Sequence, residues 1–356
     1  MTVVGAYHSL QFQNGILRIL DQRALPHDMI YRDLTSVSEV VDAIRTLAVR
    51  GAPAIGAAAA YGLVLALGET PGGPEGLAAA ADALQAARPT AVNLKWALGR
   101  VMARVESVTR LSQEALQQVV LDEANAIAQE DIMNNRALGR YGAELIPDGA
   151  SVIHYCNTGS LATVDYGTAL GIIRVAYEDG KYLHVYVAET RPLLQGTRLT
   201  TWELGQLGIP HTLVVDGAMA ALMRTKRVDL CVVGCDRVAA NGDVANKIGT
   251  YQLALAARAH GIPFYVAAPS ASIDFALPNG AAIPIEERPP TEVTDIGGHR
   301  MAPLGTRVWN PAFDVTPHDL ITAIITERGI IQPPFSEWLL ALHEAIRNQH
   351  ITGGVK

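Results

Sequence analysis

Hydrophobic and polar residues alternate at the start of the chain, and this period then gives way to helical spacing. Residues 9–13 and 16–20 alternate on either side of Asn14-Gly15, the sequence of a two-residue turn, and they predict a β-hairpin. The segment Ser36-Val37-Ser38-Glu39 has the pattern of a capping box. It predicts a helix that runs to about Ala48.

Helical spacing continues from there to about Leu145. It includes the uncharged segment 51–68, which has the length of a membrane-spanning helix. Because this segment is mostly alanine and glycine, with Pro53 near its start, we interpret it as a tightly packed helix inside a core and expect no membrane insertion. The turn sequence Pro147-Asp148-Gly149 predicts a domain boundary. Residues 1–145 are therefore expected to form a mostly helical domain with a small antiparallel β element.

After this turn, short apolar segments alternate with helical ones, which is typical of a mainly parallel sheet covered by helices on both faces. The expected strands are residues 151–154, 183–188, 212–215, 228–233 and 264–267. Residues 321–326 are expected to continue a helix that starts at Thr316-Pro317. The segment from Val244 onward is also expected to be helical, with Lys247 in its first turn. The fold class is α/β, with a Rossmann-like domain over residues 146–356.

The composition limits the classes of function. The chain has 356 residues, of which 49% are hydrophobic and 18% charged, and this balance indicates a globular protein and excludes a disordered one. Its net charge of −7 and the lack of lysine or arginine runs argue against nucleic-acid binding. Three cysteines give no disulfide framework and no zinc spacing, and no secretory signal is seen, so a cytoplasmic protein without a metal is expected.

Polar side chains gather where the predicted strands end. Cys156 follows the first strand, the loop 189–196 follows the second, Asp216 the third and Asp236 the fourth. Because the carboxyl ends of parallel strands lie at one edge of the sheet, a thiol, acids, an arginine and amides should converge there, as in an active site. A helix start with Lys247 close to Asp236 further suggests an acid that acts on a phosphorylated small molecule.

Each candidate residue also has an ordinary structural interpretation. Cys156 taken alone is more often a packed core thiol, and Asp236 is as well explained as a helix cap or as an ion-pair partner of Arg237. Lys247 would be a solvated surface lysine, and His154 is interpreted as a core histidine. The chain lacks a Gly-x-Gly-x-x-Gly motif, a phosphate-binding loop and a Gly-x-Ser-x-Gly elbow, so redox and nucleotide-hydrolysing roles have no support.

Several segments resemble the methylthioribose-1-phosphate isomerase family, the metabolic branch of the superfamily that contains the α, β and δ subunits of translation initiation factor 2B. In chain order the matching segments are residues 50–56, 156–159, 190–196, 234–250, 284–288 and 310–317. They cover nearly the whole chain and are jointly specific. One departure is Cys235, where the family pattern suggests a smaller residue such as alanine.

The resemblance implies an aldose–ketose isomerisation of 5-methylthioribose 1-phosphate in methionine salvage, without a cofactor, by a homodimer with its site between the two domains. It implies Cys156 and Asp236 as the catalytic pair. We expect Asp236 to be the acid, with the pKa of its carboxyl raised by burial at the apolar strand end. It also implies substrate contacts from Arg50, Gly51, Ala52, Arg88, Gln195, Asn246 and Lys247. The alternatives are a ribose-1,5-bisphosphate isomerase and a non-catalytic regulatory subunit of the initiation-factor type.

Overall fold

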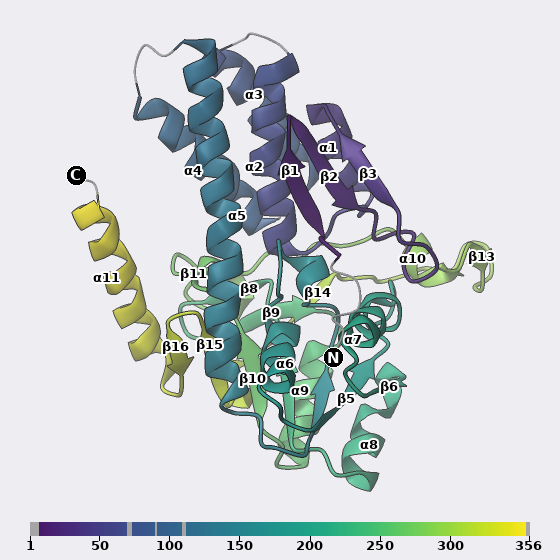
Figure 1. Cartoon of the computed structure of the whole chain (residues 1–356). Coiled ribbons are helices and arrows are strands. Elements are labelled where there is room, and N and C mark those ends of the chain that lie inside the picture. The colour runs from purple at the N-terminus through teal and green to yellow at the C-terminus, as the bar shows by residue number, and fades with distance from the viewer. Residues whose placement is uncertain (1–6, 70–72, 90, 109–111, 354–356) are drawn as a thin grey trace. The chain divides into compact units, whose positions relative to one another are not determined.

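The computed structural model describes residues 7–69, 73–89, 91–108 and 112–353 (Figure 1). The chain divides into two compact units. The first unit comprises Met1–Arg136 and Asn157–Gly171, and the second comprises Ala137–Cys156 and Ile172–Lys356. These units are discontinuous in the sequence. The predicted division into domains 1–145 and 146–356 therefore stays a prediction.

The first unit begins with an antiparallel sheet of β1 (Leu10–Gln13), β2 (Ile16–Leu20) and β3 (Tyr31–Leu34). Asn14 and Gly15 connect β1 to β2 with φ angles of 51° and 74°. Positive φ at both central residues is what a tight hairpin turn of matching twist needs, and asparagine and glycine adopt it at low cost. The predicted hairpin is confirmed. The sheet gains its third strand from a segment whose mainly polar, exposed residues gave no strand signal.

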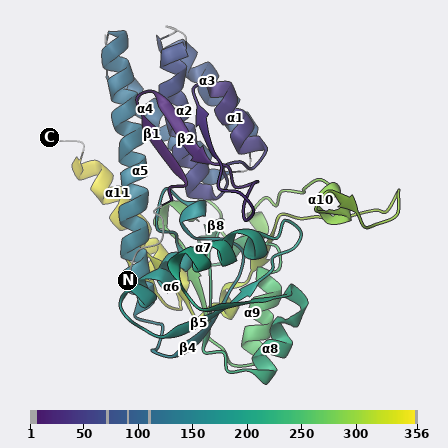
Figure 2. The same ribbon diagram turned by 45° about the vertical axis from the view of Figure 1, so that its right-hand side comes forward.

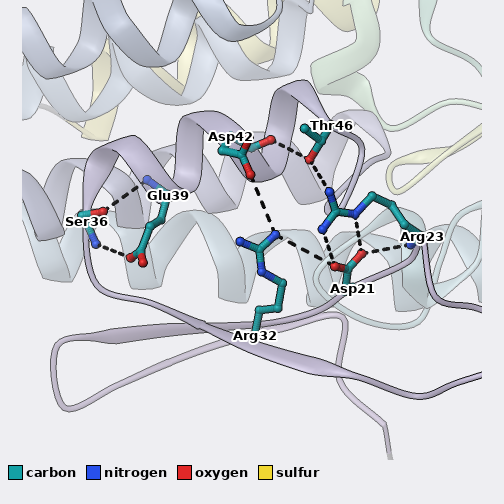
Figure 3. Close-up of polar contacts among 7 residues, drawn as sticks. All are labelled: Asp21, Arg23, Arg32, Ser36, Glu39, Asp42 and Thr46. Atoms are coloured by element: carbon teal, nitrogen blue, oxygen red, sulfur yellow. Dashed lines mark hydrogen bonds and ion pairs between the residues drawn. The ribbon is translucent and has the colours of Figure 1, made fainter.

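Helix α1 (Val37–Arg45) starts with the predicted capping box, which Figure 3 shows. The Ser36 hydroxyl accepts a hydrogen bond from the Glu39 backbone N–H at 3.2 Å, and the Glu39 carboxylate accepts one from the Ser36 N–H at 3.1 Å. Nearby, Arg23 donates to the Asp21 carboxylate at 2.6 Å. The local sequence thus satisfies the first N–H groups of this helix, as predicted.

The core of the first unit is built around helix α2. Further helices of this unit are α2 (Ala52–Glu69), α3 (Gly73–Ala87), α4 (Val92–Glu106) and α5 (Gln113–Ala143), which continues into the second unit. Among the described residues, α2 alone is long and apolar enough for a membrane span, but 72% of it is buried in the unit. A Cβ on Gly56 would lie 3.0 Å from the backbone of Asn93, so small residues permit this close packing. The prediction of a packed core helix is confirmed.

The second unit contains a seven-stranded sheet within the described residues, with the order β16-β15-β10-β7-β4-β5-β6. Its strands are β4 (Ala150–His154), β5 (Leu183–Ala188), β6 (His211–Val214), β7 (Leu230–Val233), β10 (Phe264–Ala267), β15 (Ala323–Thr326) and β16 (Gly329–Ile331). All neighbouring pairs are parallel except β15 and β16. From β4 the chain adds β5 and then β6 on one side of the sheet. It then crosses back and adds β7 on the other side of β4. This is a Rossmann-like order with its switch point between β4 and β7, and the predicted α/β class is confirmed.

Helices cover the large sheet (Figure 2). They are α6 (Ala169–Glu178), which begins in the first unit, α7 (Thr201–Leu207), α8 (Met219–Thr225), α9 (Thr250–Ala259) and α11 (Phe335–Gly353). One face of the sheet packs on apolar residues of α8, α9 and α11, such as Met223, Leu253 and Leu339. Strands buried on both faces read as continuous apolar runs, which is why the sequence revealed most of them.

A smaller sheet of the second unit has the order β11-β8-β9-β14. Its strands are β11 (Ile273–Asp274), β8 (Arg237–Ala239), β9 (Val244–Lys247) and β14 (Phe313–Thr316). A short helix, α10 (Thr291–Thr294), leads to a hairpin of β12 (Asp295–Ile296) and β13 (His299–Arg300).

Two predicted helical segments are wrong. Val244–Lys247 is strand β9, because Gly242 makes a turn with φ of 92° and Val244 then pairs with Val238 of β8. Residues 323–326 form the buried strand β15, and only a single turn, His318–Leu320, follows Pro317. In both cases strand pairing across the fold overrides a local pattern that suits a helix.

Candidate functional site

The two candidate catalytic residues lie at the ends of neighbouring parallel strands. His154 of β4 pairs in register with Val232 of β7, and Cys156 follows β4 after one intervening residue. Asp236 follows β7 after two intervening residues. These strands flank the switch point of the sheet, because β4 connects to β5 on one side and β7 connects to β10 on the other. Ligands of α/β proteins bind at such switch points. The structure therefore brings Cys156 and Asp236 to the place that the sequence pattern predicts.

Cys156 has an unusual backbone conformation. Its φ angle is 66°, in the left-handed region that a residue with a Cβ adopts at a cost. Its backbone N–H donates to the Thr190 hydroxyl at 3.0 Å, and its carbonyl accepts from the Thr200 hydroxyl at 2.7 Å. The residue is only partly buried at the edge of the apolar core. This placement differs from that of Cys231, which is a sealed core thiol inside β7.

Asp236 enters the smaller sheet. Its backbone N–H donates to the Ala245 carbonyl at 2.9 Å, and the chain continues directly into β8. The helix-cap interpretation of Asp236 is therefore wrong, because a strand and not a helix follows it. The Arg237 guanidinium lies 3.7 Å from the Asp274 carboxylate. Asp236 is partly exposed, so its side chain is not sealed in the core.

Lys247 ends strand β9 and is only 7% exposed, which excludes a solvated surface lysine. Burial lowers the pKa of Lys247, and the negative charges of Cys156, Asp236 and Glu292 act against this shift. One buried ammonium is thus within electrostatic range of both candidate catalytic groups. Thiol, carboxyl and amine all belong to the second unit, and the Asp236 N–H bonds Ala245 of the strand that ends at Lys247.

The predicted anion site at the following helix start is wrong in its detail. Helix α9 begins after Gly249, and its first N–H groups already have an anionic partner from the protein. The Asp314 carboxylate accepts hydrogen bonds from Gly249 N–H at 2.7 Å and from Tyr251 N–H at 3.1 Å. Burial raises the pKa of Asp314 to about 6, although these N–H groups and the charge of Lys247 favour its ionised form. A substrate anion would have to rely on Lys247 and not on this helix end.

Two amide side chains of the predicted substrate set also belong to the second unit. The Asn246 amide donates to the Thr250 hydroxyl at 3.0 Å and is buried. Gln195 is 8% exposed, and its Oε1 atom is buried without a hydrogen-bond partner among the described residues. A buried acceptor without a donor is costly, so Gln195 is suited to receive a hydrogen bond from a ligand.

The remaining predicted substrate residues lie in the first unit. Arg50 donates to the Asn157 carbonyl at 3.2 Å and also to the Asn157 side-chain oxygen, next in sequence to Cys156. Gly51 has a φ of 93°, and a Cβ there would lie 2.2 Å from the Ala162 carbonyl, so only glycine fits. Ala52 is the first residue of α2, and Arg88 follows α3 directly.

Other residues of the strand ends have structural partners. Asp216, expected among the active-site acids, instead accepts the Thr190 N–H at 2.9 Å and the Arg191 N–H at 2.7 Å. The predicted core role of His154 is confirmed, since it is fully buried and its Nδ1 bonds the Val232 carbonyl at 2.9 Å. Sequence reasoning missed the roles of Thr190 and Thr200, because a threonine hydroxyl carries no sign of its backbone partner. Among the described residues no cluster of histidine, cysteine and acidic side chains fits a metal ion.

Comparison with known proteins decides the family. Residues 48–333 match the initiation factor 2 subunit family. The chain belongs to this family. A methylthioribose-1-phosphate isomerase of a Synechococcus species is 54% identical over 338 residues, which cover 94% of this chain and 97% of the relative. The resemblance found in the sequence is thereby confirmed.

Solved structures of initiation factor 2 subunit family members share the fold. The 5-methylthioribose 1-phosphate isomerase of Pyrococcus horikoshii superposes with a TM-score of 0.90 at 44% identity, covering 96% of this chain and 97% of that one. A chain from A. fulgidus described as translation initiation factor eIF-2B, subunit delta, gives a TM-score of 0.83 at 45% identity, with 93% and 97% covered. The family fold thus occurs under both an enzymatic and a translational description, and the function has to be argued from the site.

Proposed function

We propose that the chain catalyses the isomerisation of 5-methylthioribose 1-phosphate to 5-methylthioribulose 1-phosphate in methionine salvage. The observation that carries the proposal is the placement of three groups: Cys156 and Asp236 follow neighbouring strands at the switch point, and Asp236 bonds the strand that the buried Lys247 ends. A regulatory subunit has no need for a thiol, an acid and a buried amine at one strand edge. The relatives described as isomerases support the same reaction.

The reaction needs an acid because the phosphate ester on C1 prevents the sugar ring from opening freely. In the proposed mechanism Asp236 gives a proton to the ring oxygen, and the C–O bond between that oxygen and C1 breaks. Cys156 takes the proton of the C2 hydroxyl as C2 becomes the ketone. One hydrogen moves from C2 to C1, either directly as hydride or through an enediol-like species, so the product has the atoms and charge of the substrate.

The protonation states follow from the balance of charge. Glu292 already pairs with Arg288 at 2.5 Å, which leaves the ammonium of Lys247 to Cys156 and Asp236. One positive charge in a poorly solvated site best balances one negative charge. We propose that Cys156 and Asp236 share one proton, with the thiol ionised and the carboxyl protonated in the reactive form. Binding of the substrate phosphate adds negative charge and further favours the protonated carboxyl.

The phosphate is proposed to bind to Arg50, Arg88 and Lys247, since guanidinium groups make paired hydrogen bonds to phosphate oxygens. The buried Oε1 of Gln195 would accept a hydrogen bond from a sugar hydroxyl. The other proposed substrate contacts are Gly51, Ala52 and Asn246. The methylthio group needs only apolar surroundings.

A direct assay tests the function. Purified protein is given 5-methylthioribose 1-phosphate or ribose 1,5-bisphosphate without added cofactor, and the ketose product is measured by NMR. We expect turnover of the methylthio substrate and much slower turnover of the bisphosphate. Turnover of the bisphosphate alone would replace the substrate in the proposal, and no product from either would favour a regulatory subunit.

The active form is proposed to be a homodimer in the cytoplasm. The three free cysteines, two of them partly exposed, suit a reducing compartment. Light scattering coupled to size-exclusion chromatography measures the oligomeric state. A mass of one chain at working concentrations would contradict the dimer.

A further inference from the structure

The backbone of Cys156 is held in a conformation that it would not adopt alone. A φ of 66° at a residue with a side chain costs free energy and persists only where surrounding contacts impose it. The peptide groups at this residue are bonded to side chains and not to a strand ladder, because Cys156 lies beyond the last residue of β4. The direction of the thiol thus depends on those side chains.

Two threonine hydroxyls provide these contacts. Thr190 accepts the Cys156 N–H at 3.0 Å and donates its own proton to the Ala188 carbonyl at the end of β5. Thr200 donates to the Cys156 carbonyl at 2.7 Å. Both threonines have no exposed surface, so water cannot replace either hydroxyl. Each hydroxyl thus gives a peptide group of Cys156 a hydrogen-bond partner from a fully buried side chain.

Thr190 is itself fixed from the next strand. It also has a φ of 66°, and its N–H donates to the Asp216 carboxylate at 2.9 Å. Asp216 follows β6, Thr190 follows β5 and Cys156 follows β4, and these three strands are neighbours in the sheet. A chain of hydrogen bonds therefore runs along the strand ends from Asp216 through Thr190 to Cys156.

We infer that Thr190 and Thr200 are positioning residues that hold the Cys156 thiol in its reactive direction beside Lys247. The inference rests on the proposed function in that the thiol acts on the substrate. A misplaced reacting group costs rate out of proportion to its displacement, so the loss of a hydroxyl here should lower kcat more than it changes KM.

Thr190→Val and Thr200→Val test the inference, because valine keeps the shape of threonine and removes its hydroxyl. Thr326→Val is a matched control. Thr326 is 1% exposed, and its hydroxyl also accepts a backbone N–H, that of Arg328, and donates to a backbone carbonyl, that of Gly329. We call Thr190 and Thr200 together the clamp of Cys156. We expect kcat to fall about 10- to 100-fold in the two clamp variants, and to stay near wild type in the control.

A second readout does not depend on turnover. The rate at which iodoacetamide alkylates Cys156 is followed by peptide mass spectrometry across pH, with the sealed Cys231 as an internal reference. In both valine variants Cys156 loses a hydroxyl contact, so its alkylation rate should differ clearly from that of the wild type. In Thr326→Val the alkylation rate of Cys156 should equal that of the wild type. Thr190→Ser and Thr200→Ser keep the hydroxyl and should restore both kcat and the alkylation rate.

The inference is overturned if both valine variants keep wild-type kcat and alkylation, or if the serine variants lose as much as the valine variants. If Thr190→Val does not fold, Thr200→Val decides the question alone, since it removes the hydroxyl that donates to the Cys156 carbonyl. Failure of the proposed function is a separate result. Full turnover by Cys156→Ser would remove the thiol from the reaction, while the alkylation rates would still report on the clamp.

Discussion

The loop after β4 and the hairpin after β7 present the two candidate catalytic groups in different ways. Cys156 lies in a loop with left-handed backbone, bonded through side-chain hydroxyls. Asp236 leads into β8, and its backbone N–H joins the ladder to β9 at Ala245. Side chains therefore place the thiol, whereas the backbone itself places the acid.

This difference decides which substitutions change the reaction rate through the chemical group alone and which also change its position. A change at the side chain of Asp236 leaves the backbone bond that positions it, so its effect on rate is a chemical one. Around Cys156 a change of a neighbour moves the thiol as well. The two regions meet where the Tyr155 hydroxyl donates to the Ile248 carbonyl at 2.8 Å, just beyond β9.

The largest effect is expected for Asp236→Asn. The amide cannot give a proton to the ring oxygen, and the loss of one general acid lowers kcat by about two to four powers of ten. Thermal unfolding should stay close to wild type, because the backbone bond to Ala245 remains. Asp274→Asn, at the carboxylate 3.7 Å from Arg237, is the control and should keep most activity. Turnover near wild type by Asp236→Asn would exclude the acid role.

Lys247→Met removes the ammonium that both groups share. Loss of a charged hydrogen bond to the phosphate and of the charge balance should lower kcat/KM by about 100-fold. A cation favours the ionised form of nearby acids, so the pH–rate profile should also move to higher pH. Steady-state kinetics across pH measure both. An unchanged profile would mean that Lys247 does not act on the pair.

Gly249→Ala should disturb the contact between the two regions. A Cβ there would lie 2.0 Å from the Tyr155 hydroxyl, and Gly249 has a φ of 101°. Overpacking together with backbone strain should reduce the free energy of unfolding by about 2–3 kcal/mol. Gly261→Ala is the matched control, because it also has a positive φ but no atom within 4 Å of a Cβ. Equal losses in chemical denaturation would show that strain alone, and not Tyr155, sets the cost.

The larger sheet could be predicted from the sequence better than the smaller one. The predicted strands at 183–188 and 264–267 have the observed bounds, because buried apolar runs between turn residues have few other structures to adopt. Strand β9 was missed because apolar residues at Val244, Ile248 and Tyr251 have helical spacing across a strand-to-helix junction. Pairing with the neighbouring β8 and with β14, which is remote in the sequence, decides that segment.

For the site, the topology of parallel strands was sufficient to bring Cys156 and Asp236 to neighbouring strand ends. It was not sufficient for the groups around them. The burial of Lys247 depends on a strand that the sequence did not reveal. The occupation of the α9 helix start by Asp314 depends on a residue 65 positions away from Gly249. Such partners are set by tertiary structure and leave no local signal.

His154 connects the two regions within the sheet and gives a pH dependence. Its ring bonds the Val232 carbonyl of β7, and burial lowers the pKa of His154 from 6.5 to about 4. The unfolded chain therefore takes up this proton first, so stability present above pH 6.5 is lost as the pH falls. His154 alone contributes a loss of about 2 kcal/mol between pH 7 and pH 5, whereas the raised pKa of Asp314 contributes in the opposite sense. The difference in urea-unfolding free energy between wild type and His154→Gln should therefore change by about 2 kcal/mol over this range, and a constant difference would contradict a neutral buried imidazole.

The smallest effect is expected outside both regions, at the capping box of α1. Ser36→Ala removes the acceptor of the Glu39 N–H, which costs about 1 kcal/mol at this partly buried helix start. Because Ser36 contacts neither strand end, kcat should not change, and the cost should appear only in the unfolding midpoint. A fall in kcat at constant substrate saturation would mean that the first unit's packing reaches the catalytic groups. The thiol and the acid would then depend on more of the chain than the loop after β4 and the hairpin after β7.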